Sequence, residues 1–249
     1  MTMTTAPFLS VRNIDKFFGS RAARRQVLFD VSADVRPGEC LAVIGGSGSG
    51  KSTLTRIMLG LETADAGTVD YAGGDVRRES GLVFQDPFAS LDPRWRVARS
   101  VAEPLLIQRR DLSRADIDAR AALALRTVGL DPDVFASRYP IDLSGGQAQR
   151  VTIARAIVNE PKVILADEPM SAIDVAARIQ ILDAFATIRE THRETAIIMV
   201  SHDLGVVRHL ADRILVLHDG RVEECGPTAA VLGDPQSAYT RRLIAAASL

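Results

Sequence analysis

The sequence is poor in cysteine and lysine and contains no long apolar run. Its two cysteines, Cys40 and Cys225, exclude a disulfide framework and offer no cluster with metal-ligand spacing, so both are expected to be small core or strand residues. No apolar run reaches the ~18 residues that a membrane-spanning helix needs. Residues 1–6 lack a basic segment and an apolar core, so no signal peptide is expected.

Charge argues against nucleic acid as a partner. The formal net charge is −1 at pH 7, and we see no local cluster of basic residues that would attract a phosphate backbone. The 249 residues are 47% hydrophobic, which is ample for one large domain or for a domain with a subdomain. No nucleic acid is therefore predicted among the binding partners.

Residues 45–53 form the most informative stretch of the chain. They are Gly45, Gly46, Ser47, Gly48, Ser49, Gly50, Lys51, Ser52 and Thr53. This glycine-rich segment follows the apolar run 41–44 and precedes a helix-forming stretch at 54–59, which is the context that a phosphate-binding loop requires. An ordinary glycine turn is the alternative. However, Lys51 is one of only three lysines in the chain, and it stands where the motif requires a lysine.

The chemistry of such a loop suits a polyphosphate. Glycines let successive backbone N–H groups point at one anion, and the N-terminus of the following helix adds a partial positive charge. In this role Lys51 reaches the β- and γ-phosphates, and the Ser52 hydroxyl binds Mg²⁺.

The hydrophobic pattern predicts an α/β chain with a helical insert. Alternating residues predict strands at 8–14 and 27–35. Residues 85–94 are expected to form an irregular loop because prolines interrupt them, and a helical pattern covers 97–135. The remaining strands are expected at 41–44, 67–71, 81–84, 162–166, 196–201, 213–218 and 221–224, and the remaining helices at 148–158, 175–190, 204–210, 228–232 and 239–247.

Several polar or aromatic positions beyond the glycine-rich loop are candidates for function. Phe17 and Phe18 are expected in a loop, where they either pack at the edge of the core or stack on a nucleotide base. Residues 144–147 (Ser-Gly-Gly-Gln) open a predicted helix and are either a simple cap or a second anion site.

Three further candidates follow buried strands. Asp167 and Glu168 end one strand, where unpaired charge is costly and a phosphate-bound Mg²⁺ would offset it. In this reading Asp167 holds the metal and Glu168 faces the attacking water. His202 ends another strand at the edge where α/β sheets bind ligands, although a structural role is the alternative.

With these motifs in this order, the chain resembles the ATP-binding subunits of ABC transporters over essentially its full length. Residues 45–53 match the Walker A motif, Leu143 to Gln147 the LSGGQ signature, and Ser171 to Asp174 the D-loop. Single positions also match. Phe18 corresponds to the aromatic residue that stacks on adenine, and Gln85 corresponds to the glutamine of the Q-loop. Asp167 corresponds to the end of Walker B, Glu168 to the catalytic glutamate, and His202 to the switch histidine.

The resemblance implies an α/β fold, with a P-loop NTPase core of ABC ATPase type, an N-terminal antiparallel β subdomain and an inserted α-helical subdomain. It implies a single ABC ATPase domain over residues 1–249. Residues 1–85 and 160–249 would form the core with the β subdomain, and residues 86–159 the helical subdomain with the signature.

The resemblance also implies a mechanism that uses ATP and Mg²⁺. Two subunits would face each other head to tail, with each ATP between residues 45–53 of one subunit and Ser144, Gly145, Gly146, Gln147 and Asp174 of the other. Glu168 would polarise the attacking water, His202 would hold the γ-phosphate, and Gln85 would sense the water or the metal. The metal ligands would be Ser52, Gln85 and Asp167.

Within this family the chain is most similar to importer subunits for oligopeptides, dipeptides and nickel. Residues 84–94 are close to the FQDP-x-x-SLNPR loop of those proteins, with Asp92 in place of the usual Asn, and residues 237–243 resemble their HPYT-x-x-L tail. Other departures are Ala148 where Arg is common and Ile173 where Leu is usual. These departures make the prediction of a particular solute less specific and leave the prediction of ATP hydrolysis unchanged.

The importer resemblance implies further partners and a location. The partners are a second ABC ATPase subunit, identical or related, two transmembrane permeases and an extracytoplasmic solute-binding protein, with this chain at the cytoplasmic face of the inner membrane. Hydrolysis would drive uptake of a peptide, nickel or a similar small solute. The alternative is a soluble ABC-type ATPase that is not coupled to a transporter. The gap between Gln85 and Ser144 is too short for the coiled coil of DNA-repair members, and no catalytic position is degenerate.

Overall fold

The structure is a computed structural model that describes residues 7–20, 23–171 and 173–247. Residues 1–6, where no signal peptide was expected, and Ala172 of the D-loop lie outside the described residues. In the described ranges, no helix is both long enough and apolar enough to cross a membrane.

The chain divides into two compact units. The first comprises Met1–Glu79 and Ala196–Leu249, and the second comprises Ser80–Thr195. The second unit is therefore inserted in sequence between the two parts of the first.

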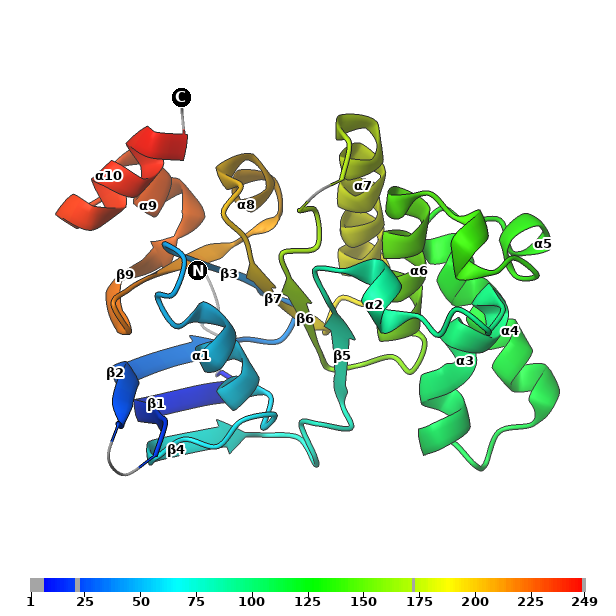
Figure 1. The fold of residues 1–249 in the computed structure, drawn as a ribbon, viewed down its shortest axis with the longest axis horizontal. Helices are drawn as coiled ribbons and strands as arrows, with labels where there is room; N and C mark the ends of the chain where they lie inside the picture. The colour runs from blue at the N-terminus through cyan, green and yellow to red at the C-terminus, as the bar shows by residue number, and fades with distance from the viewer. Residues whose placement is uncertain (1–6, 21–22, 172, 248–249) are drawn as a thin grey trace. The chain divides into compact units, whose positions relative to one another are not determined.

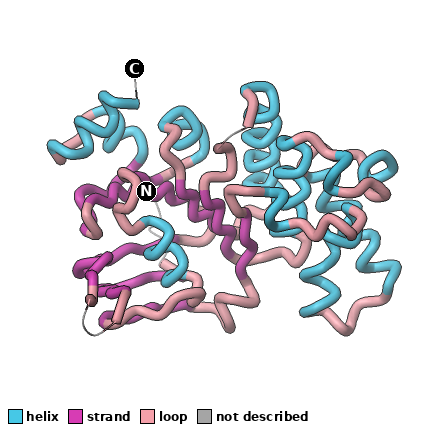
Figure 2. The backbone as a smooth tube through the Cα atoms, viewed as in Figure 1, coloured by secondary structure: helices cyan, strands magenta, loops and turns pink. Residues whose placement is uncertain are grey.

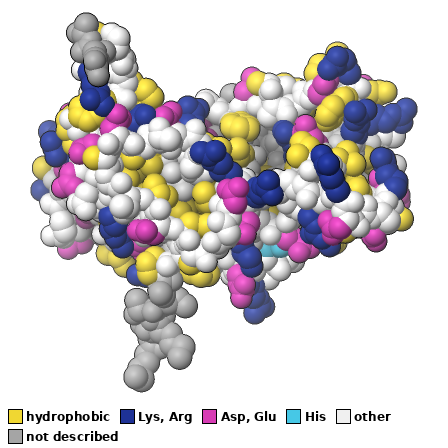
Figure 3. All heavy atoms as spheres, turned by 90° about the horizontal axis from the view of Figure 1, so that it is seen from below, with side chains coloured by type: hydrophobic (Ala, Val, Ile, Leu, Met, Phe, Trp, Pro, Cys, Tyr) yellow, Lys and Arg dark blue, Asp and Glu magenta, His cyan; other side chains and the backbone are white. Residues whose placement is uncertain are grey.

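On the face seen in Figure 3, basic and acidic side chains are interspersed over short distances.

The first unit contains an antiparallel sheet with strand order β2-β1-β4 (Figure 1). Its strands are β1 (Leu9–Phe18), β2 (Arg25–Val35) and β4 (Ala66–Tyr71). One face of β1 and β2 supplies core residues, because apolar side chains alternate with polar ones along both strands.

The prediction that the first strand ends at residue 14, with both phenylalanines in a loop, is wrong. β1 continues to Phe18, which pairs with Arg25 of β2. The pairing of β1 with β2 shifts register between Val11 and Ile14, and Asn13 adopts a positive φ of 51°. Such an irregularity interrupts the alternation from which strands are recognised.

The first unit also contains parallel strands with β3 between β7 and β8. Their bounds are β3 (Cys40–Ile44), β7 (Ala196–Val200) and β8 (Arg213–His218), and β9 (Arg221–Pro227) returns antiparallel to β8. Every residue of β3 and β7 is buried, as central parallel strands require. The helices of this unit are α1 (Lys51–Met58), α8 (Leu204–Leu210), α9 (Thr228–Gly233) and α10 (Ala238–Ala247). Cys40 is a buried residue of β3 and Cys225 an exposed residue of β9, as expected of core and strand positions.

The second unit is mainly helical (Figure 2). Two parallel strands, β5 (Ser80–Val83) and β6 (Val163–Asp167), pair within it. Its helices are α2 (Pro87–Ser90), α3 (Val97–Gln108), α4 (Arg114–Thr127), α5 (Pro132–Phe135), the 3-10 helix η1 (Pro140–Asp142), α6 (Gly145–Ile157) and α7 (Val175–Thr191). Helices α3, α4 and α6 pack on one another around buried side chains such as Val101, Leu125 and Val151.

The prediction that residues 85–94 contain no regular structure is also wrong. The one-turn helix α2 forms there, because Pro87 stands at the start of the helix, where its missing N–H costs nothing. The Asp86 carboxylate accepts hydrogen bonds from the N–H groups of Phe88 and Ala89 and caps this turn. Similarly, α6 begins at Gly145 and not at residue 148.

Candidate functional site

The glycine-rich loop lies in the first unit between β3 and α1, in the strand–loop–helix context predicted for it. Gly50 is the N-cap residue of α1 and adopts a left-handed φ of 102°. A Cβ at Gly45 would lie 2.0 Å from the carbonyl oxygen of Leu217 in β8. Both positions therefore require glycine for steric reasons.

Lys51 closes this loop on itself. Its side chain is only 8% exposed, and Nζ donates hydrogen bonds to the carbonyl oxygens of Gly45 (2.9 Å) and Gly46 (2.8 Å). Ser52 and Thr53 follow in the first turn of α1 and are half-buried, whereas Ser47 and Gly48 are exposed. A buried ammonium beside a helix N-terminus makes this loop attractive to an anion.

His202 lies at the same edge of the parallel strands as the loop. Val43 of β3 pairs with Val200 of β7, so Gly45 and His202 each stand two residues beyond a paired position. The carboxyl ends of parallel strands are where α/β folds bind ligands. The His202 side chain is exposed, and Asp203 beside it caps α8 by accepting from the N–H groups of Gly205 and Val206.

Phe18 stands at the end of β1, and its side chain is 43% exposed. The ammonium of Lys16 lies 4.9 Å from the centroid of the Phe18 ring and is held by Glu62 and by the carbonyl of Thr63. The neighbouring Phe17 is less exposed and carries the guanidinium of Arg24, 4.2 Å from its centroid. Of the two rings, Phe18 therefore offers more surface to a ligand.

The second unit places Asp167 and Glu168 at the end of β6. Both are half-buried, directly after four buried residues of the strand. Glu168 adopts a left-handed backbone with φ 47°, and its carbonyl oxygen accepts hydrogen bonds from the N–H and hydroxyl groups of Ser171. A left-handed conformation costs a glutamate about 1–3 kcal/mol.

Gln85 lies between β5 and α2 and is exposed. The carbonyl oxygen of its neighbour Phe84 accepts a hydrogen bond from the fully buried Gln149 of α6, at 3.2 Å. The glutamine loop is thus tied to the helix that begins at the signature motif.

The signature residues form the start of α6. Ser144 is the N-cap: its hydroxyl accepts from the N–H of Gln147, and the Gln147 side chain accepts from the N–H of Ser144. These two hydrogen bonds form a capping box. Ser144 therefore has the structural role of a helix cap, whether or not it also binds an anion.

The D-loop lies against the signature within the second unit. A Cβ at Gly145 would lie 3.6 Å from the side chain of Ile173 in the D-loop. A Cβ at Gly146 would lie 2.4 Å from the Cβ of Ala177 in α7, so only glycine permits this second approach. Asp174 caps α7, with one carboxylate oxygen accepting from the N–H of Ala177 at 2.9 Å. The structure therefore brings two of the predicted motifs together and shows a structural duty for Asp174.

The donor set fits Mg²⁺ better than a metal held by protein alone. Among the described residues, no group of three or more His, Cys, Asp or Glu side chains could hold a metal. Mg²⁺ commonly takes one or two protein oxygens and completes its shell with phosphate and water. The hydroxyl of Ser52, in the first unit, and the carboxylate of Asp167, in the second unit, are each an oxygen donor of this kind.

One contact at the loop was not predicted from the sequence. The N–H of Gly46 donates to the hydroxyl oxygen of Tyr239 in α10, at 2.9 Å. The sequence around Tyr239 resembles a tail motif of the importer subunits, but nothing in its spacing from the loop indicates contact.

These features together define a nucleotide-binding ATPase of the ABC class. The chain matches the protein family described as "ABC transporter" over residues 28–171, more than half of its length, and it belongs to this family. The predicted family is therefore confirmed.

The relatives include two named for peptide transport and one named for peptide import. The chain is 37% identical over 247 residues to the oligopeptide transport ATP-binding protein OppF of Haemophilus influenzae, covering 95% of this chain and 74% of the relative. It is 42% identical over 235 residues to the di/tripeptide transport ATP-binding protein DppF of Pseudomonas aeruginosa, covering 90% and 72%. A putative peptide import ATP-binding protein of Brucella ovis is 40% identical over 255 residues, covering 98% and 80%.

Solved structures agree with this placement. The ATP-binding cassette MJ0796, solved as a dimer in a post-hydrolysis state bound to ADP and Pi, is 32% identical, with a TM-score of 0.77 and coverage of 88% of this chain and 98% of the other. The protein cbiO1 of Clostridium perfringens, part of an ABC transporter complex, is 26% identical, with a TM-score of 0.79 and coverage of 92% and 91%. The predicted α/β fold of ABC ATPase type is confirmed, and the chain is an ATP-binding ATPase.

Proposed function

We propose that this chain is the ATP-hydrolysing subunit of an importer for peptides or similar small solutes. The observation that carries the proposal is the identity of 37–42%, over at least 90% of the chain, to three proteins named for peptide transport. Nickel as the solute stays a prediction of the family resemblance alone. The partners are a second ABC ATPase subunit, two permeases and an extracytoplasmic solute-binding protein, and the chain works at the cytoplasmic face of the membrane.

In the first unit, residues 45–53 would bind the phosphates of ATP, and Phe18 would stack on the adenine. The buried ammonium of Lys51 lies on the loop carbonyls, where it would neutralise phosphate charge. His202, at the same edge of the strands, would contact the γ-phosphate.

In the second unit, Glu168 would polarise the attacking water and Gln85 would sense that water. Gln85 and Asp167 are the Mg²⁺ ligands proposed in this unit, and Ser52 is the one proposed in the first unit. Mg²⁺ would neutralise charge on the β- and γ-phosphates. Residues 86–159 would act as the helical subdomain of a single ABC ATPase domain.

The signature residues 144–147 and Asp174 would bind the ATP held by a second subunit. The start of α6 is suited to this task, because the first N–H groups of a helix have no acceptor within the helix and attract an anion. ATP would then hold two subunits together until hydrolysis removes the link.

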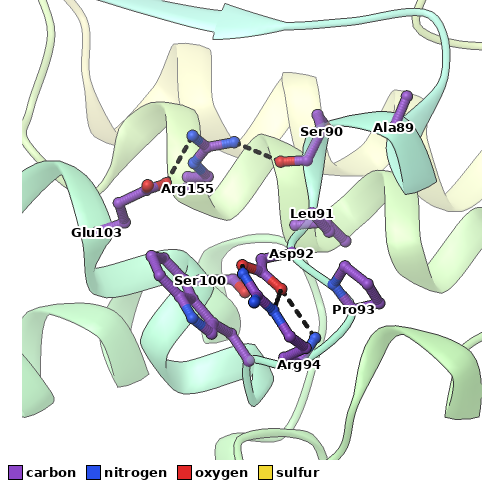
Figure 4. Close-up of a pocket in the computed structure, with 10 residues that line it drawn as sticks. Ala89, Ser90, Leu91, Asp92, Pro93, Arg94, Ser100, Glu103 and Arg155 are labelled. Atoms are coloured by element: carbon purple, nitrogen blue, oxygen red, sulfur yellow. Dashed lines mark hydrogen bonds and ion pairs between the residues drawn. The ribbon is translucent and has the colours of Figure 1, made fainter.

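The proposal assigns permease docking to a pocket of about 510 Å³ in the second unit (Figure 4). Arg155 reaches from α6 to the carbonyl oxygen of Ser90 at 2.8 Å and to the carboxylate of Glu103 at 2.6 Å. Arg94 binds the carboxylate of Asp92 through two nitrogens, and these hydrogen bonds lower the pKa of Asp92 to about 2. The pocket thus contains charged side chains, and Phe88, which precedes Ala89 of its lining, is exposed.

Replacing Glu168 tests the catalytic assignment. Glu168→Gln should retain ATP binding but lose turnover by about 100-fold or more, because the amide cannot accept a proton from water. ATP should then accumulate a closed pair of subunits, measured as a doubled mass by light scattering with Mg²⁺ and ATP.

The matched control is Glu160→Gln. Glu160 also has a positive φ, of 52°, and is exposed in the same unit. Its variant should hydrolyse ATP at the parent rate. Near-normal ATPase activity of Glu168→Gln would reassign the base, and absence of pairing by this variant, even with its membrane partners, would overturn the two-subunit site.

A further inference from the structure

The chain segment before α10 is fixed to the edge strand β9. The carboxylate of Glu224 accepts hydrogen bonds from the N–H groups of Gln236 (3.0 Å) and Ser237 (3.1 Å). The Ser237 hydroxyl donates to Glu223 at 2.9 Å and accepts from the N–H of Tyr239 at 3.1 Å. Burial raises the pKa of Glu224, but these N–H bonds, with further contributions that include the charge of Arg241, together outweigh it. The pKa therefore lies below its usual range, and the carboxylate stays charged.

This anchoring presents the Tyr239 ring to the carboxyl edge of β8. The ring stacks on His218, with 3.7 Å between centroids and 13° between planes. Because β8 is the parallel neighbour of β3, its carboxyl end lies at the edge from which the glycine-rich loop departs. The stack places the hydroxyl of Tyr239 at Gly46.

Gly46 is held on both of its polar groups. Its N–H donates to Tyr239 at 2.9 Å, while its carbonyl oxygen accepts from Lys51 Nζ at 2.8 Å and from the N–H of Ser49 at 3.3 Å. The orientation of this residue therefore links the tail of the chain to the lysine of the loop.

We propose that Tyr239 is a positioning residue for the phosphate loop, through which the segment 235–241 sets nucleotide affinity. Because the Tyr239 hydroxyl accepts the hydrogen bond of the Gly46 N–H, this N–H is not available to ATP, and other groups of the loop bind the phosphates. The hydroxyl also fixes the carbonyl on which the Lys51 ammonium rests. The inference rests on the proposed assignment of residues 45–53 to the phosphates.

The experiment is a fluorescence titration of the full chain with mant-ADP and Mg²⁺, combined with steady-state ATPase kinetics. Tyr239→Phe keeps the ring and removes the acceptor. It should raise the Kd of mant-ADP and the KM for ATP by about two- to tenfold, the range spanned by one net hydrogen bond. The kcat should change less than KM, because Tyr239 touches no reacting atom.

Two variants make the result decisive. Tyr71→Phe removes another tyrosine hydroxyl of the same unit, one that donates to Glu79, and should leave the Kd unchanged. His218→Leu keeps the Tyr239 hydroxyl but removes its stacking partner, and it should raise the Kd in the same direction; it also serves as the test if Tyr239→Phe fails to fold.

The outcomes separate this inference from the function on which it rests. A Tyr239→Phe protein with a lowered melting temperature but parent Kd and KM shows a structural role only and overturns the inference. Lys51→Ala distinguishes the second failure: if that variant binds mant-ADP like the parent, the phosphate-loop assignment itself is wrong.

Discussion

At single positions, backbone geometry restricts the sequence as strongly as side-chain chemistry does. A side chain at Gly45 would collide with the backbone of β8, and one at Gly146 would collide with Ala177. Glu168 accepts a strained left-handed conformation that glycine or asparagine would adopt more easily. Glu160 has a similar positive φ of 52°, so the chemical role proposed for Glu168 depends on its position at the end of β6 and not on the strain alone.

The exposed ring of Phe18 leads to a prediction at the same scale. Phe18→Ala should weaken ATP binding by about 1–3 kcal/mol, the usual loss when a base loses its stacking partner. Phe18→Tyr should retain most of the affinity, because stacking needs only a flat aromatic face. Isothermal titration with ATP and Mg²⁺ measures both.

Phe17→Ala is the matched control for this prediction. Phe17 is half-buried under the guanidinium of Arg24, so its loss should lower the melting temperature and leave ATP affinity unchanged. If Phe18→Ala binds ATP like the parent, or if Phe17→Ala carries the loss of affinity, Phe18 belongs to the edge of the core and not to the nucleotide site.

At the scale of elements, one residue at the start of a helix can both cap the helix and bind a ligand. Capping boxes begin both α4, at Ser113, and α6, at Ser144. Each cap contributes roughly 0.5–2 kcal/mol to stability. Only Ser144 lies in the signature motif, so substitutions of the two serines can distinguish the effect of capping from that of the proposed nucleotide binding.

We therefore predict different results for two matched substitutions. Ser113→Ala and Ser144→Ala should each lower the free energy of unfolding by about 1 kcal/mol in urea melts. Only Ser144→Ala should also reduce ATPase activity. Ser144→Asn, which is an equally good cap, should regain stability but not activity. Full activity in Ser144→Asn would mean that residue 144 serves only as a cap.

Element boundaries could be predicted where periodicity is unbroken and not where it is interrupted. The bounds of α8 and β8 follow the predicted ranges, because regular patterns run between clear caps and turns. The end of β1 was missed because the register shifts near Asn13, and α2 was missed because a proline was read as a breaker although it stands at a helix start.

At the scale of the whole molecule, sequence order does not indicate which segments meet. The glycine-rich loop was recognisable because all of its groups are local. The contact of Gly46 with Tyr239 joins residues 193 positions apart. It depends on parallel pairing of β3 with β8 and on the anchoring of segment 235–241, neither of which a local motif encodes.

Because ligand binding is linked to folding, nucleotide should stabilise the molecule as a whole. At a concentration of 100 times Kd, a ligand that binds only the folded state adds about 2.7 kcal/mol. For a chain of this size, roughly 2–4 °C of melting temperature corresponds to each kcal/mol. ATP with Mg²⁺ should therefore raise the melting temperature by about 5–10 °C, and chelating Mg²⁺ should reduce that increment.

Lys51→Ala should abolish most of this increment, because the loop loses the ammonium that rests on Gly45 and Gly46. Lys162→Ala is the matched control: it removes the same charge from an exposed position in the second unit, where Lys162 pairs with Glu194 at 3.7 Å, and it should keep the full increment. For each variant, the quantity to compare is the rise in melting temperature from nucleotide-free to nucleotide-bound protein, because Lys51→Ala also changes the stability of the nucleotide-free protein. An equal increment in both variants would contradict a phosphate site at residues 45–53, because no binding energy would then depend on the buried lysine of that loop.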